Sequence, residues 1–300
     1  MNTVRLNAYA KLNLTLDITG KEGEYHSLDS LVTTIALFDR IVVKRRKDSL
    51  IGVRMHGMGS ESIPPEENNA CRAAEGFVSR FRTAGADITI YKNIPVGAGL
   101  GGSSADAAGA LNALAKLYGI TDMVGLKALA DEFGSDTGYL LTGGLARMRG
   151  RGTQLEPLGE LPKTWFLLLL PKSGVSTAAC YRAFDEAGKT YEPHTEKAIE
   201  LLKSGNFGWA ARQFSNHLTE AAVSLNEEVK TALLEARSFS PLAAGMTGSG
   251  SGVYAVFENE ELCRWAKSRY RGKFRALCVS STTAAKKSWR NPFVLEDGEG

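Results

Sequence analysis

The residues with the clearest chemical potential form a glycine-rich segment. Residues 95–109 read Pro-Val-Gly-Ala-Gly-Leu-Gly-Gly-Ser-Ser-Ala-Asp-Ala-Ala-Gly, so four glycines lie within 97–102 and two serines follow them. Glycine tolerates positive φ and serine is a preferred helix N-cap, so the segment predicts a tight loop that leads into a helix, with Ser103 and Ser104 as candidate caps. Free backbone N–H groups and the helix dipole would favour an anion such as phosphate. The alternative is a flexible loop before a capped helix.

Three known kinds of phosphate or catalytic loop can be compared with this segment. Its glycines spell GxGxxG, but the expected strand ends several residues earlier and Asp122 lies between two helices, so a Rossmann oxidoreductase is disfavoured. A Walker A loop needs a lysine directly after the glycines, and the first one is Lys116. A GxSxG nucleophile elbow would need glycine in place of Ala105.

Alternating and periodic apolar residues predict the elements that must position this loop. Strands are expected over 4–16, 31–35, 40–44, 87–91, 142–148, 165–170, 253–258 and 275–280. Helices are expected over 70–82, 104–118, 123–133, 176–187, 196–203, 209–218, 227–237 and 260–270. The helix over 104–118 is rich in alanine, and its small side chains would let it lie close to a sheet. A loop is expected over 20–24, a domain boundary within 151–163 and an unstructured tail over 288–300.

Length and composition limit the class of protein. A chain of 300 residues is expected to form two domains of about 150 residues each, placed here at 1–155 and 156–300. The 36 basic and 33 acidic residues leave a net charge of +3, which does not favour nucleic acid as a partner. The longest apolar run, 165–170, is far shorter than the about 20 residues of a membrane span. Four scattered cysteines without a CxxC pair indicate neither a metal site nor a disulfide framework, so a cytoplasmic protein is expected.

Two further segments accompany the loop in a suggestive order. Residues 8–17 read Ala-Tyr-Ala-Lys-Leu-Asn-Leu-Thr-Leu-Asp, and residues 245–254 read Gly-Met-Thr-Gly-Ser-Gly-Ser-Gly-Val-Tyr. Together with the Pro-x-x-x-Gly-Leu-Gly-x-Ser-Ser pattern that starts at Pro95, they resemble the three motifs of the GHMP kinase superfamily, which includes galactokinase, homoserine kinase and mevalonate kinase. The chain is most similar to the branch whose alcohol substrate carries a cytidine diphosphate group in the non-mevalonate isoprenoid pathway.

The resemblance implies a two-domain α+β fold, with an N-terminal domain like ribosomal protein S5 domain 2 and a C-terminal domain of ferredoxin-like type. It also implies an ATP-dependent phosphotransferase that uses ATP and Mg²⁺ and acts on an alcohol held between the domains. The expected assembly is a monomer or a weak homodimer, without nucleic acid or membrane.

The resemblance also assigns roles to individual residues. Asp136 would be the general base and Lys11 would lie beside it and hold it ionised, while Ser104 would lie near Mg²⁺. ATP would contact Asn68, Pro95, Val96, Gly97, Ala98, Gly99, Leu100, Gly101, Gly102, Ser103, Ser104 and Ala105. The acceptor would contact Asn13, Tyr25, His26, Thr177, Tyr181, Thr247 and Gly248, with the cytosine base held by Tyr25, His26 and Tyr181.

Two alternatives remain at this stage. The segments 21–26 and 134–140 depart from the usual pattern of that branch, so a divergent GHMP kinase with another alcohol acceptor is an alternative. A non-catalytic GHMP-fold protein that binds a nucleotide or metabolite is the other. The joint presence of Lys11, Ser104 and Asp136 argues against this second alternative, because a protein that only binds has no need of a base.

Overall fold

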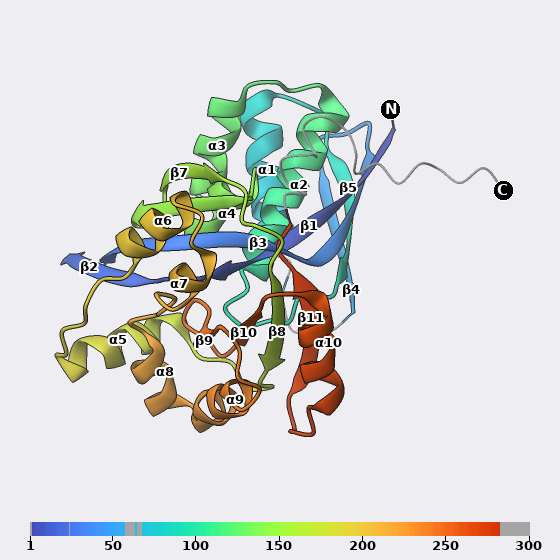
Figure 1. Cartoon of the computed structure of the whole chain (residues 1–300). Coiled ribbons are helices and arrows are strands. Elements are labelled where there is room, and N and C mark those ends of the chain that lie inside the picture. The colour runs from blue at the N-terminus through green and yellow to red at the C-terminus, as the bar shows by residue number, and fades with distance from the viewer. Residues whose placement is uncertain (1, 24, 58–63, 65–67, 283–300) are drawn as a thin grey trace.

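Two β-sheets carry the fold of the computed structural model, which describes residues 2–23, 25–57, 64 and 68–282 (Figure 1). Seven strands make the first sheet, in which β1, β2, β5 and β6 all pair with β3. These strands are β1 (Thr3–Asn13), β2 (Asp17–Glu22), β3 (Tyr25–Arg45), β4 (Ile51–Gly57), β5 (Ala86–Lys92), β6 (Leu145–Gly150) and β7 (Gln154–Gly159). Strand β3 is therefore the centre of the sheet.

Strand β3 is one strand of 21 residues, where the sequence predicted two shorter ones. Polar residues interrupt its apolar pattern, but they are buried and paired in the structure. Thr34, for example, donates to the Thr282 carbonyl at 2.7 Å and accepts the Gly144 N–H at 3.0 Å. The loop expected over 20–24 is wrong for residues 20–22, which belong to β2 and pair with residues 25–27 of β3. Gly23 lies in a turn, and residue 24 lies outside the described residues.

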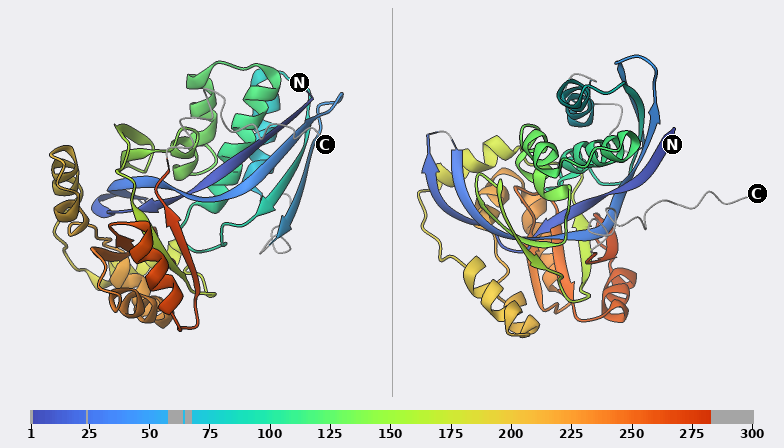
Figure 2. Two further views of the ribbon diagram at one scale, coloured as in Figure 1. Left: turned by 45° about the vertical axis from the view of Figure 1, so that its right-hand side comes forward. Right: turned by 90° about the horizontal axis from the view of Figure 1, so that it is seen from above.

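Four helices form the layer over the first sheet, and the third of them packs on the other three (Figures 1 and 2). They are α1 (Asn69–Phe81), α2 (Gly102–Tyr118), α3 (Met123–Asp131) and α4 (Ser135–Leu140). The alanine-rich α2 approaches β1 and β3 closely, as expected. A Cβ atom added at Gly109 would lie 2.9 Å from both the Ala8 Cβ and the Ile41 Cγ1. The sequence did not predict α4, which begins directly before Asp136.

The second sheet has four antiparallel strands in the order β11-β8-β10-β9. They are β8 (Trp165–Leu170), β9 (Ala243–Met246), β10 (Val253–Phe257) and β11 (Arg275–Ser280). The helices of this half are α5 (Thr177–Ala187), α6 (Thr195–Lys203), α7 (Phe207–Ala211), α8 (Thr219–Leu225), α9 (Glu227–Arg237) and α10 (Glu260–Arg269). The strand order, with helices in the connections, confirms the ferredoxin-like arrangement.

The single helix expected over 209–218 is wrong, because α7 ends at Ala211 and α8 begins at Thr219. The chain between them runs beside Leu16. Leu16 donates its N–H to the Ser215 carbonyl, and His217 donates its N–H to the Leu16 carbonyl, both at 2.9 Å. These two bonds hold the segment extended and remove it from any helix. Strands β4, β7 and β9 were also not predicted.

The two halves share a continuous interior. Tyr254 of β10 is buried, and its hydroxyl donates to the Leu14 carbonyl at 3.0 Å. Ile199 of α6 and Phe214 belong to the same hydrophobic core as the first sheet. Strand β7, which follows residue 155 for most of its length, pairs with β6 of the first sheet. A division between residues 155 and 156 stays a prediction.

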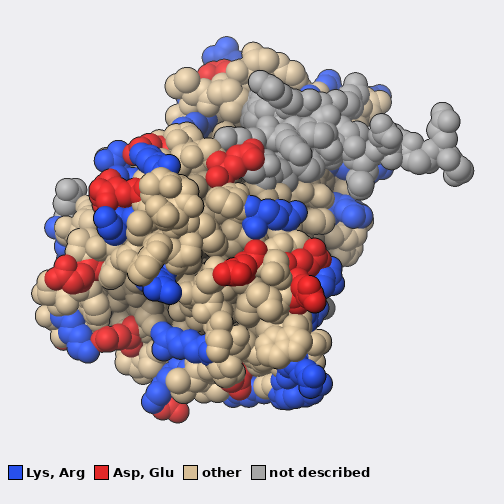
Figure 3. Space-filling view, in the orientation of Figure 1, with Lys and Arg blue, Asp and Glu red and all other residues tan. Residues whose placement is uncertain are grey.

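Two expectations concern the surface and the tail. Figure 3 shows Lys and Arg interspersed with Asp and Glu over the face that it views, without a field of one sign. None of the described helices is long and apolar enough to cross a membrane. The tail expected over 288–300 lies outside the described residues.

The buried Tyr254 hydroxyl provides a test of how firmly the halves are joined. The Tyr254→Phe variant leaves the Leu14 carbonyl without this donor in a buried place, so we expect the free energy of unfolding to fall by about 1–3 kcal/mol. Tyr191→Phe is the matched control, because the Tyr191 hydroxyl bonds Glu220 at an exposed site. Urea unfolding monitored by fluorescence measures both, and equal losses in the two variants would contradict the interpretation.

Candidate functional site

The glycine-rich loop adopts a backbone that other residues rarely take. Gly97, Gly99 and Gly101 have φ values of 71°, 70° and 71°. Gly101 is the N-cap of α2 and has no side-chain capping bond. The expectation that Ser103 or Ser104 caps this helix is therefore wrong, because both serines lie inside its first turn. The first N–H groups of α2 are left without a side-chain acceptor, as an anion site at a helix start requires.

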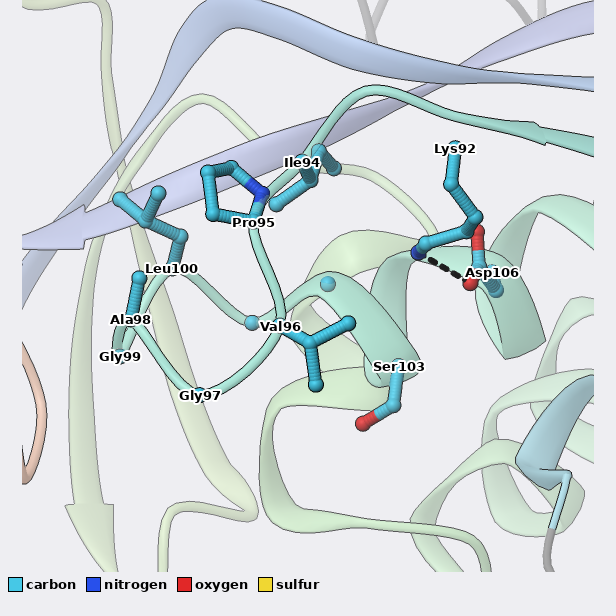
Figure 4. A pocket seen from close by; sticks show the side chains of 12 residues that line it. Lys92, Ile94, Pro95, Val96, Gly97, Ala98, Gly99, Leu100, Ser103 and Asp106 are labelled. Atoms are coloured by element: carbon cyan, nitrogen blue, oxygen red, sulfur yellow. Dashed lines mark hydrogen bonds and ion pairs between the residues drawn. The ribbon is translucent and has the colours of Figure 1, made fainter. Parts of the chain in front are cut away.

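A pocket of about 180 Å³ lies at this helix start. Figure 4 shows the loop curling in front of the first turn of α2, with Ser103 beneath it. The lining residues are Lys92, Ile94, Pro95, Val96, Gly97, Ala98, Gly99, Leu100, Gly101, Gly102, Ser103 and Asp106. We call it the loop pocket. It contains most of the residues assigned to ATP from the sequence, apart from Asn68, Ser104 and Ala105.

The third glycine segment holds the loop from the other side. The N–H groups of Ser251 and Gly252 donate to the carbonyls of Gly97 and Ala98 at 3.3 and 3.2 Å. A Cβ atom added at Gly99 would lie only 2.1 Å from the Thr247 carbonyl oxygen. The two segments therefore pack backbone against backbone, which only glycine permits at this position.

An ion pair lies beside the loop. Lys11 Nζ is 3.0 Å from Asp136 Oδ2, and the two side chains are 5% and 22% exposed. Lys11 also donates to Asn13 Oδ1 at 2.6 Å, and Asn13 in turn donates to the Ser30 hydroxyl at 2.8 Å. The half-exposed face of Asp136 remains available to a ligand, while Asn13 fixes the direction of Lys11.

The loop reaches this ion pair at Gly101. Lys11 donates its backbone N–H to the Leu100 carbonyl at 3.0 Å. A Cβ atom at Gly101 would lie 3.1 Å from Lys11 Cγ and 3.5 Å from Asp136 Oδ2. The structure thus brings together the residues of the first two motifs and the acid of α4.

The two serines of α2 face different neighbours. Ser103 lines the loop pocket. Ser104 is turned toward the start of α4, since a Cβ atom at Gly134 would lie 3.2 Å from its hydroxyl oxygen. The Ser104 hydroxyl and the Asp136 carboxylate are therefore hard oxygen donors near the same helix start, of the kind that Mg²⁺ accepts together with phosphate oxygens.

A buried lysine network that sequence reasoning missed anchors the loop. Lys92 Nζ pairs with Asp39 and, at 2.5 Å, with Asp106. Asp39 also accepts the N–H groups of Asn93 and Ile94, where the loop begins. Burial raises the pKa of Asp106 to about 8, against the opposing effect of Lys92, and the charge of Asp39 contributes in the same direction. The sequence signal for this network was Asp106, an acidic residue in a helix whose other residues are mostly small and apolar.

A larger pocket of about 1140 Å³ reaches Gly134 and Ser135, which come directly before Asp136 in the chain. It brings together the predicted residues Tyr25, His26, Thr177 and Tyr181. Its other lining residues, none of which sequence reasoning assigned to the site, are Lys21, Gly23, Leu28, Asp131, Glu132, Gly134, Ser135, Arg151, Thr153, Ala178, Arg182 and Asp185.

The lining of this pocket combines aromatic rings with side chains of both charges, Lys21, Arg151 and Arg182 beside Asp131, Glu132 and Asp185. The Arg151 guanidinium carbon lies 3.4 Å from the centroid of the Tyr25 ring, a cation–π contact. Burial, with a contribution from the negative charge of Asp136, raises the pKa of Tyr181 to about 12, so this phenol stays protonated at neutral pH. Because Gly134 and Ser135 also line the pocket, it extends to the residues next to Asp136.

Three predicted site residues have structural partners. Asn68 caps α1 by accepting the Ala70 and Cys71 N–H groups, and it lines neither pocket. Thr247 accepts the Asn13 N–H at 3.0 Å and donates to the Gly99 carbonyl. Gly248 accepts a hydrogen bond from Asn216 at 2.8 Å. Their assignment to ATP or the acceptor stays a prediction.

Comparison with known proteins identifies the class. The family described as GHMP kinases N terminal domain matches residues 68–144, and GHMP kinases C terminal matches residues 198–268. The family models and the fold are thus those of the GHMP kinases, which confirms the resemblance and the expected class of activity.

The relatives narrow this class further. The protein named 4-diphosphocytidyl-2-C-methyl-D-erythritol kinase of Desulfitobacterium hafniense is 40% identical, over 87% of this chain and 89% of its own. Its namesake in Moorella thermoacetica is 34% identical, over 94% and 100%. A crystal structure of 4-(cytidine 5'-diphospho)-2C-methyl-D-erythritol kinase is 31% identical with a TM-score of 0.76, over 93% of this chain and 99% of that one. The chain belongs to the 4-diphosphocytidyl-2-C-methyl-D-erythritol kinase family.

The Lys92 network predicts a pH dependence of stability. A carboxyl group whose pKa is higher in the folded chain than in the unfolded chain binds its proton more tightly when folded. The free energy of unfolding therefore falls as pH rises from the unfolded value, about 4, toward the folded value, about 8. In Asp106→Asn this contribution is absent, so we expect the decline between pH 5 and pH 8 to be smaller by about 1 kcal/mol or more.

Urea unfolding at several pH values measures this decline. Asp87→Asn, at an exposed acid on the neighbouring strand, is the control and keeps the wild-type slope. A slope in Asp106→Asn as steep as that of the wild type would contradict the prediction.

Proposed function

We propose that this protein transfers the terminal phosphoryl group of ATP to the 2-hydroxyl of 4-diphosphocytidyl-2-C-methyl-D-erythritol, a step of the non-mevalonate isoprenoid pathway. The observation that carries the proposal is the contact at Gly101, where the glycine loop meets the Lys11–Asp136 ion pair. Gly101 lines the loop pocket, and Gly134 and Ser135, directly before Asp136, line the larger aromatic pocket. The relatives at 34–40% identity are named as kinases of that compound.

The loop pocket is the proposed site of the ATP phosphates. The uncapped start of α2 supplies N–H donors and the positive end of the helix dipole. The carbonyl groups of Gly97 and Ala98 are bonded to the third glycine segment and so do not oppose the anion.

The donors near α4 fit Mg²⁺. Ser104 and Asp136 offer hard oxygen atoms, and Mg²⁺ in kinase sites takes few protein ligands besides phosphate oxygens and water. Bound there, Mg²⁺ would neutralise negative charge on the phosphates. Ser104 would hold the ion from the first turn of α2.

Asp136 is the proposed base. Its exposed oxygen can accept the proton of the acceptor hydroxyl as the new P–O bond forms, while Lys11 stabilises the carboxylate and the developing negative charge. Asn13 keeps Lys11 in this direction. The chain thus supplies positioning and charge, which phosphoryl transfer needs most.

The larger pocket is the proposed acceptor site. Tyr25, His26 and Tyr181 offer flat faces and one polar edge for cytosine, and Arg151 and Arg182 offer positive charge for a diphosphate. A non-catalytic binding protein would not require the Lys11–Asp136 pair. Another alcohol acceptor is tested by a panel of alcohols with and without the cytidine diphosphate group.

Asp136→Asn tests the base. The amide keeps the shape of the side chain but cannot accept the proton, so we expect kcat to fall about 10²- to 10⁴-fold. The dissociation constant for ATP, measured by calorimetry in the absence of Mg²⁺, should change little, because the loop pocket itself is unaltered. Glu258→Gln, at an exposed acid far along the chain, serves as control. Wild-type kcat in Asp136→Asn would remove Asp136 from this role.

Gly101→Ala tests the contact between loop and ion pair. The added Cβ would press on Lys11 and strain a backbone with φ of 71°, so we expect kcat/KM to fall about 100-fold. Gly119→Ala is a matched control, because Gly119 has the same kind of φ (70°) but open space around a Cβ atom. The control should lose stability without this loss of kcat/KM. An equal loss in both variants would show that strain alone is responsible.

A further inference from the structure

A chain of three polar side chains crosses the wall of the larger pocket. Asp185 Oδ1 lies 2.6 Å from His26 Nε2, and Asp185 Oδ2 lies 2.5 Å from Lys21 Nζ. The hydrogen bond from Lys21, followed by that from His26, lowers the pKa of Asp185 despite its partial burial. An ionised carboxylate only accepts hydrogen bonds, so His26 carries a proton on Nε2.

The ring of His26 is held in one orientation by helix α5. It stacks on Tyr181 with centroids 4.7 Å apart and rings inclined by 27°, and it meets Phe184 edge-on at 6.2 Å. Tyr181 and Asp185 are four residues apart on α5 and thus share a face of that helix. The His26 side chain is only 7% exposed, so a flip of the ring would break both the stack and the bond to Asp185.

The other ring nitrogen of His26, Nδ1, is then free to bind a ligand. No described residue forms a hydrogen bond with Nδ1. In a neutral imidazole protonated at Nε2, Nδ1 is an acceptor. Cytosine presents an amino donor at the position where uracil presents a carbonyl acceptor. An acceptor at Nδ1 therefore suits cytosine and opposes uracil.

We propose that Asp185 is a positioning residue that makes the acceptor site select cytosine over uracil by fixing the tautomer of His26. Lys21 holds the carboxylate in place for this purpose. The inference rests on the proposed function, because it takes the larger pocket to be the site of the acceptor's base. Asp185 itself need not touch the base.

The variant Asp185→Asn gives the sharpest test. The Lys21 ammonium is a donor only, so the amide must turn its oxygen toward Lys21 and its NH₂ group toward His26. Nε2 then has to accept, and the proton moves to Nδ1, which becomes a donor. In a Ser-His-Asp site, the same Asp-to-Asn replacement imposes the wrong tautomer in this way. The preference for cytosine should therefore disappear or reverse in favour of uracil.

Calorimetric titration of the full chain with CDP and with UDP measures this preference. We expect the wild type to bind CDP about tenfold or more tightly than UDP, and Asp185→Asn to bind CDP no better than UDP. The ratio of kcat/KM for the cytidine and uridine forms of the acceptor should change in the same direction. Glu186→Gln, at the next and exposed acid of α5, should keep the wild-type ratio.

A double variant distinguishes an effect of the His26 tautomer from an effect of altered packing around His26. In Lys21→Met/Asp185→Asn the amide is free to turn its oxygen toward Nε2, so part of the preference for CDP should return. An unchanged CDP/UDP ratio in Asp185→Asn, or no recovery in the double variant, would overturn the role of Asp185 while leaving the proposed function intact. A wild type that binds neither CDP nor UDP would overturn the proposed acceptor site as well.

Discussion

The close approach of two backbones underlies the whole site. Gly99 lies against the Thr247 carbonyl at a distance that no side chain would allow, and the N–H groups of Ser251 and Gly252 donate to the carbonyls of the residues before Gly99. This contact joins a loop of the first sheet to a turn between β9 and β10 of the second. Because the first motif also bonds Thr247 through Asn13, three segments distant in sequence are fixed relative to one another.

Buried charge supports the same loop from behind. The carboxyl groups of Asp39 and Asp106 share the Lys92 ammonium, and Asp39 also accepts the N–H groups at the start of the loop. Removal of Lys92 or Asp39 would leave the opposite charge uncompensated in a buried place, which is costly. Two features thus fix the shape of the loop: the close approach at Gly99, and the hydrogen bonds from the Asn93 and Ile94 N–H groups to Asp39.

Helices and strands that depend on a local sequence pattern were predicted well. Most helices and the strands over 87–91, 165–170 and 275–280 were found within a residue or two, because their periodicity is uninterrupted. The sequence did not predict that β3 is one continuous strand. Its polar residues Thr34 and Asp39 suggested a break, because their burial depends on partners that are distant in sequence. Helix α4 was missed because six residues give no period.

The candidate site was predictable to a similar degree. The resemblance to a known family was enough to predict the glycine-rich loop, Lys11 and Asp136 as parts of one site. The structure adds the contacts between them. The roles of Lys92, Asp106 and Asp185 were not predicted, because each depends on a partner at least 14 residues away in sequence. The caps of α2 were misassigned for a local reason, since Gly101 adopts a left-handed conformation and takes the N-cap position itself.

The length of β3 has one more consequence. The same strand begins with Tyr25 and His26 at the larger pocket, passes Thr34 opposite Lys11, and continues to Asp39 behind the loop. The separation between the larger pocket and the Lys11–Asp136 ion pair is therefore set by the number of residues along one hydrogen-bonded strand rather than by a hinge. In the proposed function, this fixed distance would limit the length of the acceptor that the protein can use.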